Sequence, residues 1–320
     1  MESYRSPWWL PGRHLQTILP GVVNTLFPWP SIKWKRTRWD TPDKDFIDVD
    51  WTGNASATRL LVLFHGLEGN RDAHYARSLA QWAVAGGWRF AFVNFRGCSG
   101  EPNNTCRAYH AGDSDEIDWI LRKFSSEHEH VCAAGVSLGG NALLKWLGEQ
   151  GMEAAKVVRC AAAISAPFDL ASFSPSLARG FSRVYGWYFL YATPMRRKAF
   201  AILKRCPNAF CEQALREAST LPEFENAVTA PLHGFKNAQD YWARASALPM
   251  LCGIRVPTLI LNARNDPFLP DHVLAAVQWN IDDLSEQVIL EFPAQGGHAG
   301  FPGRDDWMAR RVFEFFSPPG

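Results

Sequence analysis

The chain has 320 residues, 47% of them hydrophobic and 20% charged, and a formal net charge of +1. Such a chain can bury a large core, and its charge balance excludes a bulk electrostatic attraction to nucleic acid or to an anionic membrane. No run reaches the ~18 apolar residues of a membrane span, and the first residues lack the pattern of a signal peptide. We therefore expect no membrane span and no nucleic-acid partner.

Seven cysteines form an odd set without C-x-x-C or Cys/His ligand spacing. Several of them lie in apolar runs, where cysteine behaves as a small hydrophobic residue. The pattern predicts neither a disulfide framework nor a zinc site, and a reducing cytoplasm is the simplest location.

Residues 1–31 contain five prolines with aromatic residues between them. Because proline removes a backbone donor and breaks helices, we expect an irregular N-terminal arm, without a long helix, that packs across the body. The aromatic side chains leave a second interpretation open, in which the arm forms a membrane-interface or substrate-channel surface.

Residues 32–167 show the pattern of a mostly parallel, doubly wound α/β sheet. Alternating polar and apolar residues predict two outer, half-exposed strands at 32–39 and 46–51. Continuous apolar runs then predict buried strands, which are separated by helices. The expected buried strands are 59–64, 90–95, 131–136 and 157–165, and the expected helices are 75–85, 113–124 and 141–147.

The pattern is interrupted over residues 168–249, which are aromatic, basic and helical in places. We expect these residues to form a helical cap inserted into the sheet domain, and residues 250–320 to complete that domain. The expected elements of this last part are strands at 257–262 and 287–292 and helices at 272–279 and 307–316.

Residues 135–139 (GVSLG) fit G-x-S-x-G, a turn that lifts a nucleophilic serine above a sheet. The apolar run before the motif and the helical pattern after it supply the strand and the helix that this turn needs. A serine in so tight a turn requires neighbours without side chains two positions away, and Gly135 and Gly139 meet that need. An ordinary glycine-containing loop is the alternative. We take Ser137 as the candidate nucleophile.

A serine hydroxyl needs a positioned base, and in chains with this turn the acid and the histidine follow later strands. Asp266 and His298 each come directly after one of the last two expected strands. We predict that His298 is the general base and that Asp266 orients it. Asp282 and Asp283 are alternatives to Asp266, but they precede a strand and are expected at the opposite edge of the sheet.

Two backbone N–H groups are predicted to stabilise the negative charge that develops on the substrate oxygen. One belongs to Leu138, directly after the nucleophile. The other belongs to Leu67 in residues 65–70 (HGLEGN), which match an H-G-x-x-G loop. We expect His65 to brace this loop rather than to act as a base.

Motifs along nearly the whole chain carry a resemblance to a known family. They are residues 13–17 (RHLQT), 45–51 (DFIDVDW), 96–103 (RGCSGEPN), 109–113 (YHAGD), 229–235 (TAPLHGF), 265–268 (NDPF) and 296–301 (GGHAGF). With them the chain resembles the YheT-like hydrolases, a branch of the α/β-hydrolase family. The resemblance implies a serine hydrolase of carboxylic esters, with relatives linked to short- and medium-chain acyl esters, acylglycerols, phospholipids and acyl transfer to alcohols. For Cys98, in the third motif, we expect a structural role because no base or acid is evident for it.

The resulting prediction is a carboxylic ester hydrolase that forms an acyl-enzyme on Ser137, without a metal or another cofactor. Aromatic residues of the expected cap indicate an acyl chain in the small-molecule ester substrate, although most of them would pack within the cap. An acyltransferase that passes the acyl group to an alcohol and a non-catalytic binding protein are the alternatives. Basic residues between 179 and 205 indicate solvated helix faces or peripheral contact with anionic lipid. The sequence does not indicate an oligomeric state.

Overall fold

The computed structural model describes residues 3–27, 30–279, 283–303 and 305–317. Its centre is an eight-stranded sheet with the order β1-β2-β4-β3-β5-β6-β7-β8, in which β2 pairs antiparallel with β1 and β4 and all other neighbours are parallel. The prediction of a mostly parallel, doubly wound α/β sheet is therefore confirmed. The strands are β1 (Lys35–Asp40), β2 (Phe46–Gly53), β3 (Arg59–Phe64), β4 (Arg89–Asn94), β5 (His130–Val136), β6 (Cys160–Ile164), β7 (Thr258–Leu261) and β8 (Val288–Glu291).

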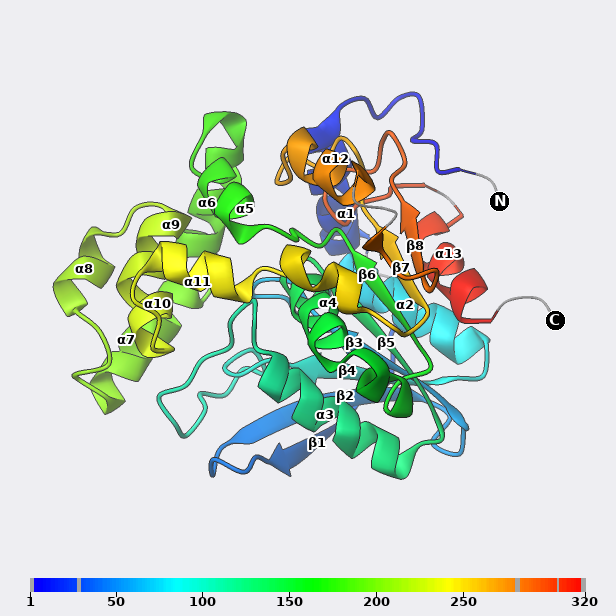
Figure 1. Cartoon of the computed structure of the whole chain (residues 1–320), viewed down its shortest axis with the longest axis horizontal. Helices are drawn as coiled ribbons and strands as arrows, with labels where there is room; N and C mark the ends of the chain where they lie inside the picture. Colours follow the sequence, from blue (N-terminus) through cyan, green and yellow to red (C-terminus); the bar gives the residue numbers. More distant parts are fainter. Residues whose placement is uncertain (1–2, 28–29, 280–282, 304, 318–320) are drawn as a thin grey trace.

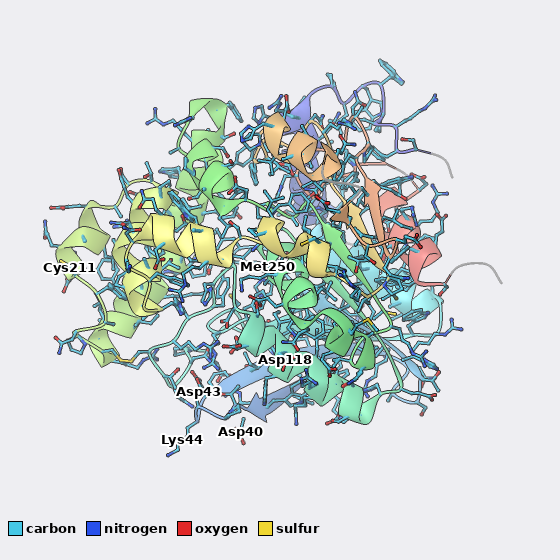
Figure 2. The ribbon with its side chains drawn as sticks, viewed as in Figure 1. Asp40, Asp43, Lys44, Asp118, Cys211 and Met250 are labelled. Atoms are coloured by element: carbon cyan, nitrogen blue, oxygen red, sulfur yellow. A yellow bond between two sulfur atoms is a disulfide. The ribbon has the colours of Figure 1, made fainter. Side chains whose placement is uncertain are left out.

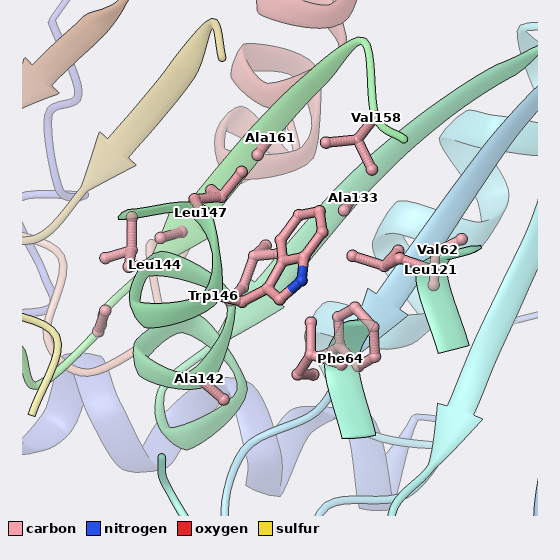
Figure 3. Close-up of a cluster of buried hydrophobic side chains, with 14 of the residues drawn as sticks. Val62, Phe64, Leu121, Ala133, Ala142, Leu144, Trp146, Leu147, Val158 and Ala161 are labelled. Carbon is pink, nitrogen blue, oxygen red and sulfur yellow. The ribbon is translucent and has the colours of Figure 1, made fainter. Parts of the chain in front are cut away.

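Helices cover both faces of the sheet (Figure 1). Helices α3, α4 and α12 contribute to the buried cluster on one face, and α2 and α13 to the cluster on the other. Figure 3 shows how α4 packs, with the fully buried Trp146 close to Val62 and Phe64 of β3. This packing anchors the helix that starts directly after Ser137. The bounds are α2 (His74–Ala85), α3 (Ser114–Glu127), α4 (Leu138–Gln150), α12 (Asp271–Trp279) and α13 (Trp307–Phe316).

Strand β2 is not the half-exposed outer strand that its sequence predicts. It lies between β1 and β4, and its residues from Phe46 to Trp51 are all buried. Arginines directly opposite on β1 pair with the alternating acidic residues. Arg36 donates two 2.8 Å hydrogen bonds to Asp50, and Arg38 donates two of 2.8 Å to Asp48. Alternation here reflects buried aspartates that pair with partly exposed arginines of β1, rather than exposure of β2 itself to water.

The N-terminal segment contains a long helix, α1 (Arg13–Leu26), contrary to the prediction of an irregular arm. Pro20 lies inside this helix and cannot donate the hydrogen bond to residue i−4. Contacts with the body compensate for the loss: Gln16, Thr17 and Asn24 all form hydrogen bonds to residues outside the helix. Tertiary contacts override local propensity in this case.

Residues 168–249, which we call the cap, are helical and lie between β6 and β7 (Figure 1). Their buried side chains, such as Leu190, Leu215 and Phe224, form a hydrophobic cluster that also includes Ala111 and Phe268 of the core. The division of the chain into arm, core and cap remains a prediction. The cap helices are α5 (Leu170–Ser176), α6 (Arg183–Trp187), α7 (Met195–Arg205), α8 (Glu212–Glu217), α9 (Leu221–Phe224), α10 (Ala230–Leu232) and α11 (Ala238–Ala245), with π-helical turns η3 (Tyr188–Ala192) and η4 (Glu225–Thr229). The 3-10 turns are η1 (Gly151–Lys156), η2 (Gly180–Ser182) and η5 (Leu248–Gly253).

A disulfide joins Cys106, in the loop between β4 and α3, to Cys206, directly after α7. The prediction of no disulfide framework is therefore wrong. The expectation of a reducing location rested on that prediction, so it is no longer supported. The two residues are 100 positions apart, so their spacing held no signal. Figure 2 shows another cysteine, Cys211, at the outer end of the cap, where it is free and exposed. Across the described ranges, no helix is long and apolar enough to cross a membrane.

Candidate active site

Ser137 occupies the turn between β5 and α4 in a strained backbone conformation, with φ 54° and ψ −119°. Side chains on the glycines of the motif would not fit. A Cβ on Gly135 would overlap the carbonyl oxygen of Gly139, and a Cβ on Gly139 would overlap that of Phe64. The motif therefore forms a tight strand-to-helix turn that presents Ser137 above the carboxyl edge of the sheet.

The structure brings Ser137, His298 and Asp266 into one hydrogen-bonded chain. His298 Nε2 lies 2.9 Å from Ser137 Oγ, and His298 Nδ1 lies 2.8 Å from Asp266 Oδ2. A carboxylate can only accept, so Nδ1 carries the proton and Nε2 is free to accept from the serine hydroxyl. This is the arrangement in which a histidine can take up the proton of a serine nucleophile.

The alternative acids do not lie in this chain. Asp266 follows β7 and is buried, and its second oxygen accepts a 2.8 Å bond from the N–H of Phe268. Asp283 is exposed and precedes β8, so it lies at the opposite edge of the parallel strands. Asp282 is outside the described residues.

The two predicted oxyanion donors lie beside Ser137. Leu67 and Leu138 line the same cavity as Ser137, and Gly66 is so close that an added Cβ would come within 3.2 Å of the Ser137 Cβ. Over the part of the chain that the structure describes, neither N–H of the two leucines donates to another protein group. Both are available to a substrate oxygen.

His65 braces the loop of Leu67. Its Nδ1 lies 2.6 Å from the Gly66 carbonyl oxygen, and its Nε2 accepts a 3.2 Å bond from the N–H of Phe95. Burial lowers the pKa of His65 to about 4, so the ring is neutral and holds these two bonds at once. Neither of these two bonds joins the His65 ring to the Ser137 hydroxyl, as expected for a residue that braces the loop.

A second support of the same loop comes from Glu68, which sequence analysis missed. Glu68 has a positive φ of 54° and a nearly inaccessible side chain. Tyr109 Oη accepts a 2.9 Å bond from the Glu68 N–H and donates a 2.9 Å bond to its carboxylate. Lys198, on α7 of the cap, lies 2.7 Å from the same carboxylate. These contacts link the cap to the residue that follows Leu67.

The loop that carries His298 rests on α1. Thr17 Oγ1 accepts a 2.9 Å bond from the His298 N–H, and Gln16 Oε1 accepts bonds of 2.9 and 3.0 Å from Asn265 Nδ2 and the Gly296 N–H. Sequence reasoning assigned no role to these residues. The only signal was the motif at 13–17, which contributed to the family resemblance without indicating a contact.

A cavity of about 590 Å³ extends from Ser137 between the core and the cap. Its walls include apolar side chains of the cap such as Phe173, Phe189, Ile202 and Phe224. Glu225 also lines it and receives bonds from Ser174 Oγ at 2.5 Å and Trp242 Nε1 at 2.8 Å. Burial raises the pKa of Glu225 to about 7. A cavity of this size and character fits an acyl chain.

Cys98 lies at the wall of this cavity, and Lys198 Nζ is 3.2 Å from its sulfur. Against the effect of burial, Cys98 and Glu68 raise the pKa of Lys198, so this amine is protonated and does not serve as a base. Burial raises the pKa of the Cys98 thiol to about 11, which keeps it protonated and a poor nucleophile. Among the described residues, no group of three or more His, Cys, Asp or Glu side chains could hold a metal ion.

The chain is similar to known proteins over most of its length. The alpha/beta hydrolase fold family matches residues 59–304. The Escherichia coli (strain K12) protein named "Putative esterase YheT" is 37% identical over 297 residues, which are 91% of this chain and 84% of that protein. "Phospholipase ABHD3" of Mus musculus is 27% identical over 314 residues, 94% and 73% of the two chains. The solved Pyrococcus furiosus esterase Pf2001 has a similar fold, with a TM-score of 0.57 at 16% identity, covering 90% of this chain and 94% of that one.

Proposed function

Because the chain belongs to the α/β-hydrolase family and to its YheT-like branch, we propose that it hydrolyses carboxylic esters through an acyl-enzyme on Ser137. Its relatives include esterases and phospholipases, so the chain is an α/β hydrolase of the esterase and lipase type. The observation that carries the finer proposal is the hydrogen-bonded chain of Ser137, His298 and Asp266, which opens into an apolar cavity.

In this reaction Ser137 Oγ attacks the ester carbonyl carbon while His298 Nε2 takes the hydroxyl proton. The new Oγ–carbon bond gives a tetrahedral intermediate, whose negative oxygen accepts hydrogen bonds from the N–H groups of Leu67 and Leu138. His298 then returns the proton to the leaving alcohol as the carbon–oxygen bond of the ester breaks. Water repeats the two steps on the acyl-enzyme, which releases the acid and restores the Ser137 hydroxyl.

The cavity supports short- to medium-chain acyl or lipid-like esters as substrates. Its apolar walls can bury a hydrocarbon chain, which favours binding by about 0.8 kcal/mol for each CH₂ group. Neither a metal nor another cofactor takes part in this proposal, since the serine, the histidine and the two N–H groups provide nucleophile, base and electrostatic stabilisation.

The proposal is tested by hydrolysis of p-nitrophenyl esters from acetate to palmitate, with the wild type beside Ser137→Ala. We expect an optimum in chain length that disappears in the variant, and covalent labelling of the wild type alone by a fluorophosphonate. Turnover that persists in Ser137→Ala would reject Ser137 as the nucleophile. Absence of both turnover and labelling in the wild type would reject the ester hydrolase itself.

A further inference from the structure

Large apolar side chains are exposed very unevenly on this molecule. Within the described ranges, thirteen of the sixteen exposed large hydrophobic side chains lie in two segments, residues 8–27 and 181–191. Trp8, at the start of the first segment, is 92% exposed. Exposed large apolar side chains gathered in this way are uncommon on monomeric proteins unless a partner covers them, so the two segments are a candidate interaction surface.

Helix α1 turns its apolar side away from the protein. Its exposed apolar residues recur three or four positions apart and so share one side of the helix: Leu15, Ile18, Val22 and Leu26. The opposite side carries polar residues that bond to the body, such as Thr17 to His298 and Asn24 to the Asp72 carbonyl. A surface helix of a globular protein normally has the reverse arrangement, with its apolar side on the core.

The second segment continues the same surface from the cap. Its exposed side chains, on η2, α6 and η3, are Phe181, Val184, Trp187, Tyr188 and Tyr191. The two segments meet at His14 of α1, whose ring lies 4.3 Å from the Phe181 ring and whose Nδ1 lies 3.1 Å from the Tyr185 hydroxyl. Helices α1 and α6 both lie in the upper part of the view in Figure 1. We call these residues and the four of α1 the aromatic surface.

The two segments that form the aromatic surface carry only positive charge. Residues 3–27 and 170–191 contain Arg5, Arg13, Arg179 and Arg183 and no Asp or Glu residue. Arg13, Arg179 and Arg183 border the surface and are exposed. Throughout the described part of the chain, none of these three has an ion-pair partner. A net charge of +1 for the whole chain conceals this local excess.

We propose that the aromatic surface docks on the surface of an anionic lipid bilayer. Exposed Trp and Tyr side chains suit the level of the lipid headgroups, and unpaired arginines beside them attract anionic lipid. A second copy of the chain is a poorer occupant, because it would bring the same positive charges face to face. Docking does not depend on ester hydrolysis. The docking surface nevertheless includes α1, which supports the His298 loop. It also includes part of the cap, whose Phe189 and Lys198 line the cavity.

The test is flotation of the full chain with vesicles of phosphatidylcholine, alone or with about 30 mol% phosphatidylglycerol. We expect the wild type to bind the anionic vesicles about tenfold more strongly than the neutral ones, with a loss at high salt. Leu15→Ser/Val22→Ser/Trp187→Ser should reduce binding by about tenfold or more, whereas Val84→Ser/Met152→Ser, which removes exposed apolar groups elsewhere, should not. Arg179→Glu/Arg183→Glu should also reduce binding, unlike Lys44→Glu/Lys156→Glu.

Three results would overturn the proposal. The first is equal binding of the wild type and the surface variants, and the second is no binding to either kind of vesicle. The third is a dimer in sedimentation velocity that the Leu15→Ser/Val22→Ser/Trp187→Ser variant dissociates, which would make a second copy the occupant. Hydrolysis of a soluble ester is measured separately, so vesicle binding by an inactive chain would reject the proposed function and leave docking intact.

Discussion

Thr17 accepts a 2.9 Å hydrogen bond from the backbone N–H of His298, although 281 positions separate the two residues. Gln16, its neighbour on α1, binds the loops of both Asp266 and His298 through Asn265 and Gly296. One N-terminal helix therefore holds the two loops that supply the acid and the base of the proposed hydrolysis. From this arrangement we expect α1 to set the position of the His298 ring.

Thr17→Val should lower kcat by about tenfold with little change in KM, because it leaves the His298 N–H without a partner, a loss of ~1.4 kcal/mol. The measurement is steady-state hydrolysis of a soluble ester together with the rate of fluorophosphonate labelling. Thr25→Val is the matched control, since Thr25 also bonds a carbonyl four residues back, at 3.0 Å, but does not contact the His298 loop. Equal effects of the two substitutions would contradict a positioning role for Thr17.

Lys198→Met should lower kcat by about 10- to 100-fold, because it leaves the buried Glu68 carboxylate without its ion-pair partner beside Leu67, the proposed oxyanion donor. Lys204→Met, a change at an exposed position of the same helix, should have no such effect. Adding Glu68→Gln to Lys198→Met should recover part of the loss, since the unpaired charge is then gone. If the double variant is worse than Lys198→Met alone, the ion pair does not act through Leu67.

Glu225 should make the folded protein less stable as the pH rises from about 4.5 to 7. Burial raises its pKa from 4.5 to about 7, so within this window the folded chain keeps a proton that the unfolded chain has lost. Over this range the free energy of unfolding of the wild type should fall by an amount on the order of a few kcal/mol because of Glu225, and Glu225→Gln should abolish that contribution. The measurement is urea unfolding at several pH values. Burial raises the pKa of Glu116 to about 7 as well, so the difference between wild type and variant is the relevant quantity. The exposed Glu217→Gln should reproduce the wild-type slope, and an unchanged slope in Glu225→Gln would contradict the prediction.

The Cys106–Cys206 disulfide should be detectable by counting thiols. In denaturant, five thiols should react before reduction and seven after it. Cys106→Ser/Cys206→Ser should lower the free energy of unfolding by about 2–4 kcal/mol, because the bond closes a long loop in the unfolded chain. The exposed Cys211→Ser should leave stability unchanged and remove one thiol from both counts. Seven reactive thiols without reductant would contradict the bond.

The parallel strands and the turn at Ser137 could be predicted because each depends on a short stretch of sequence. Buried parallel strands are apolar on both faces, so β3 to β7 appear as continuous apolar runs. The two glycines around Ser137 are required by contacts within a few residues and by β3. Asp266 and His298 could be proposed because the carboxyl ends of parallel strands meet at one edge of the sheet.

The same reasoning was misled at two other positions. The acidic residues of β2 indicated an exposed strand, because alternation alone does not show that Arg36 and Arg38, 14 and 10 positions away on the adjacent strand, pair with Asp50 and Asp48. The prolines indicated an irregular arm, because the bonds that hold α1 involve residues more than 200 positions away, such as Asn265 and His298.

By itself, the sequence determined the type and order of the sheet elements, the strained turn at Ser137 and the loops in which the proposed acid and base lie. These features follow from periodicity, backbone sterics and strand direction, which act over a few residues. Only the tertiary structure decided that α1 supports His298, that Lys198 reaches Glu68 and that the apolar side of α1 faces outward. Each of these depends on which distant surfaces meet when the chain folds, and such contacts leave no periodic trace in the sequence.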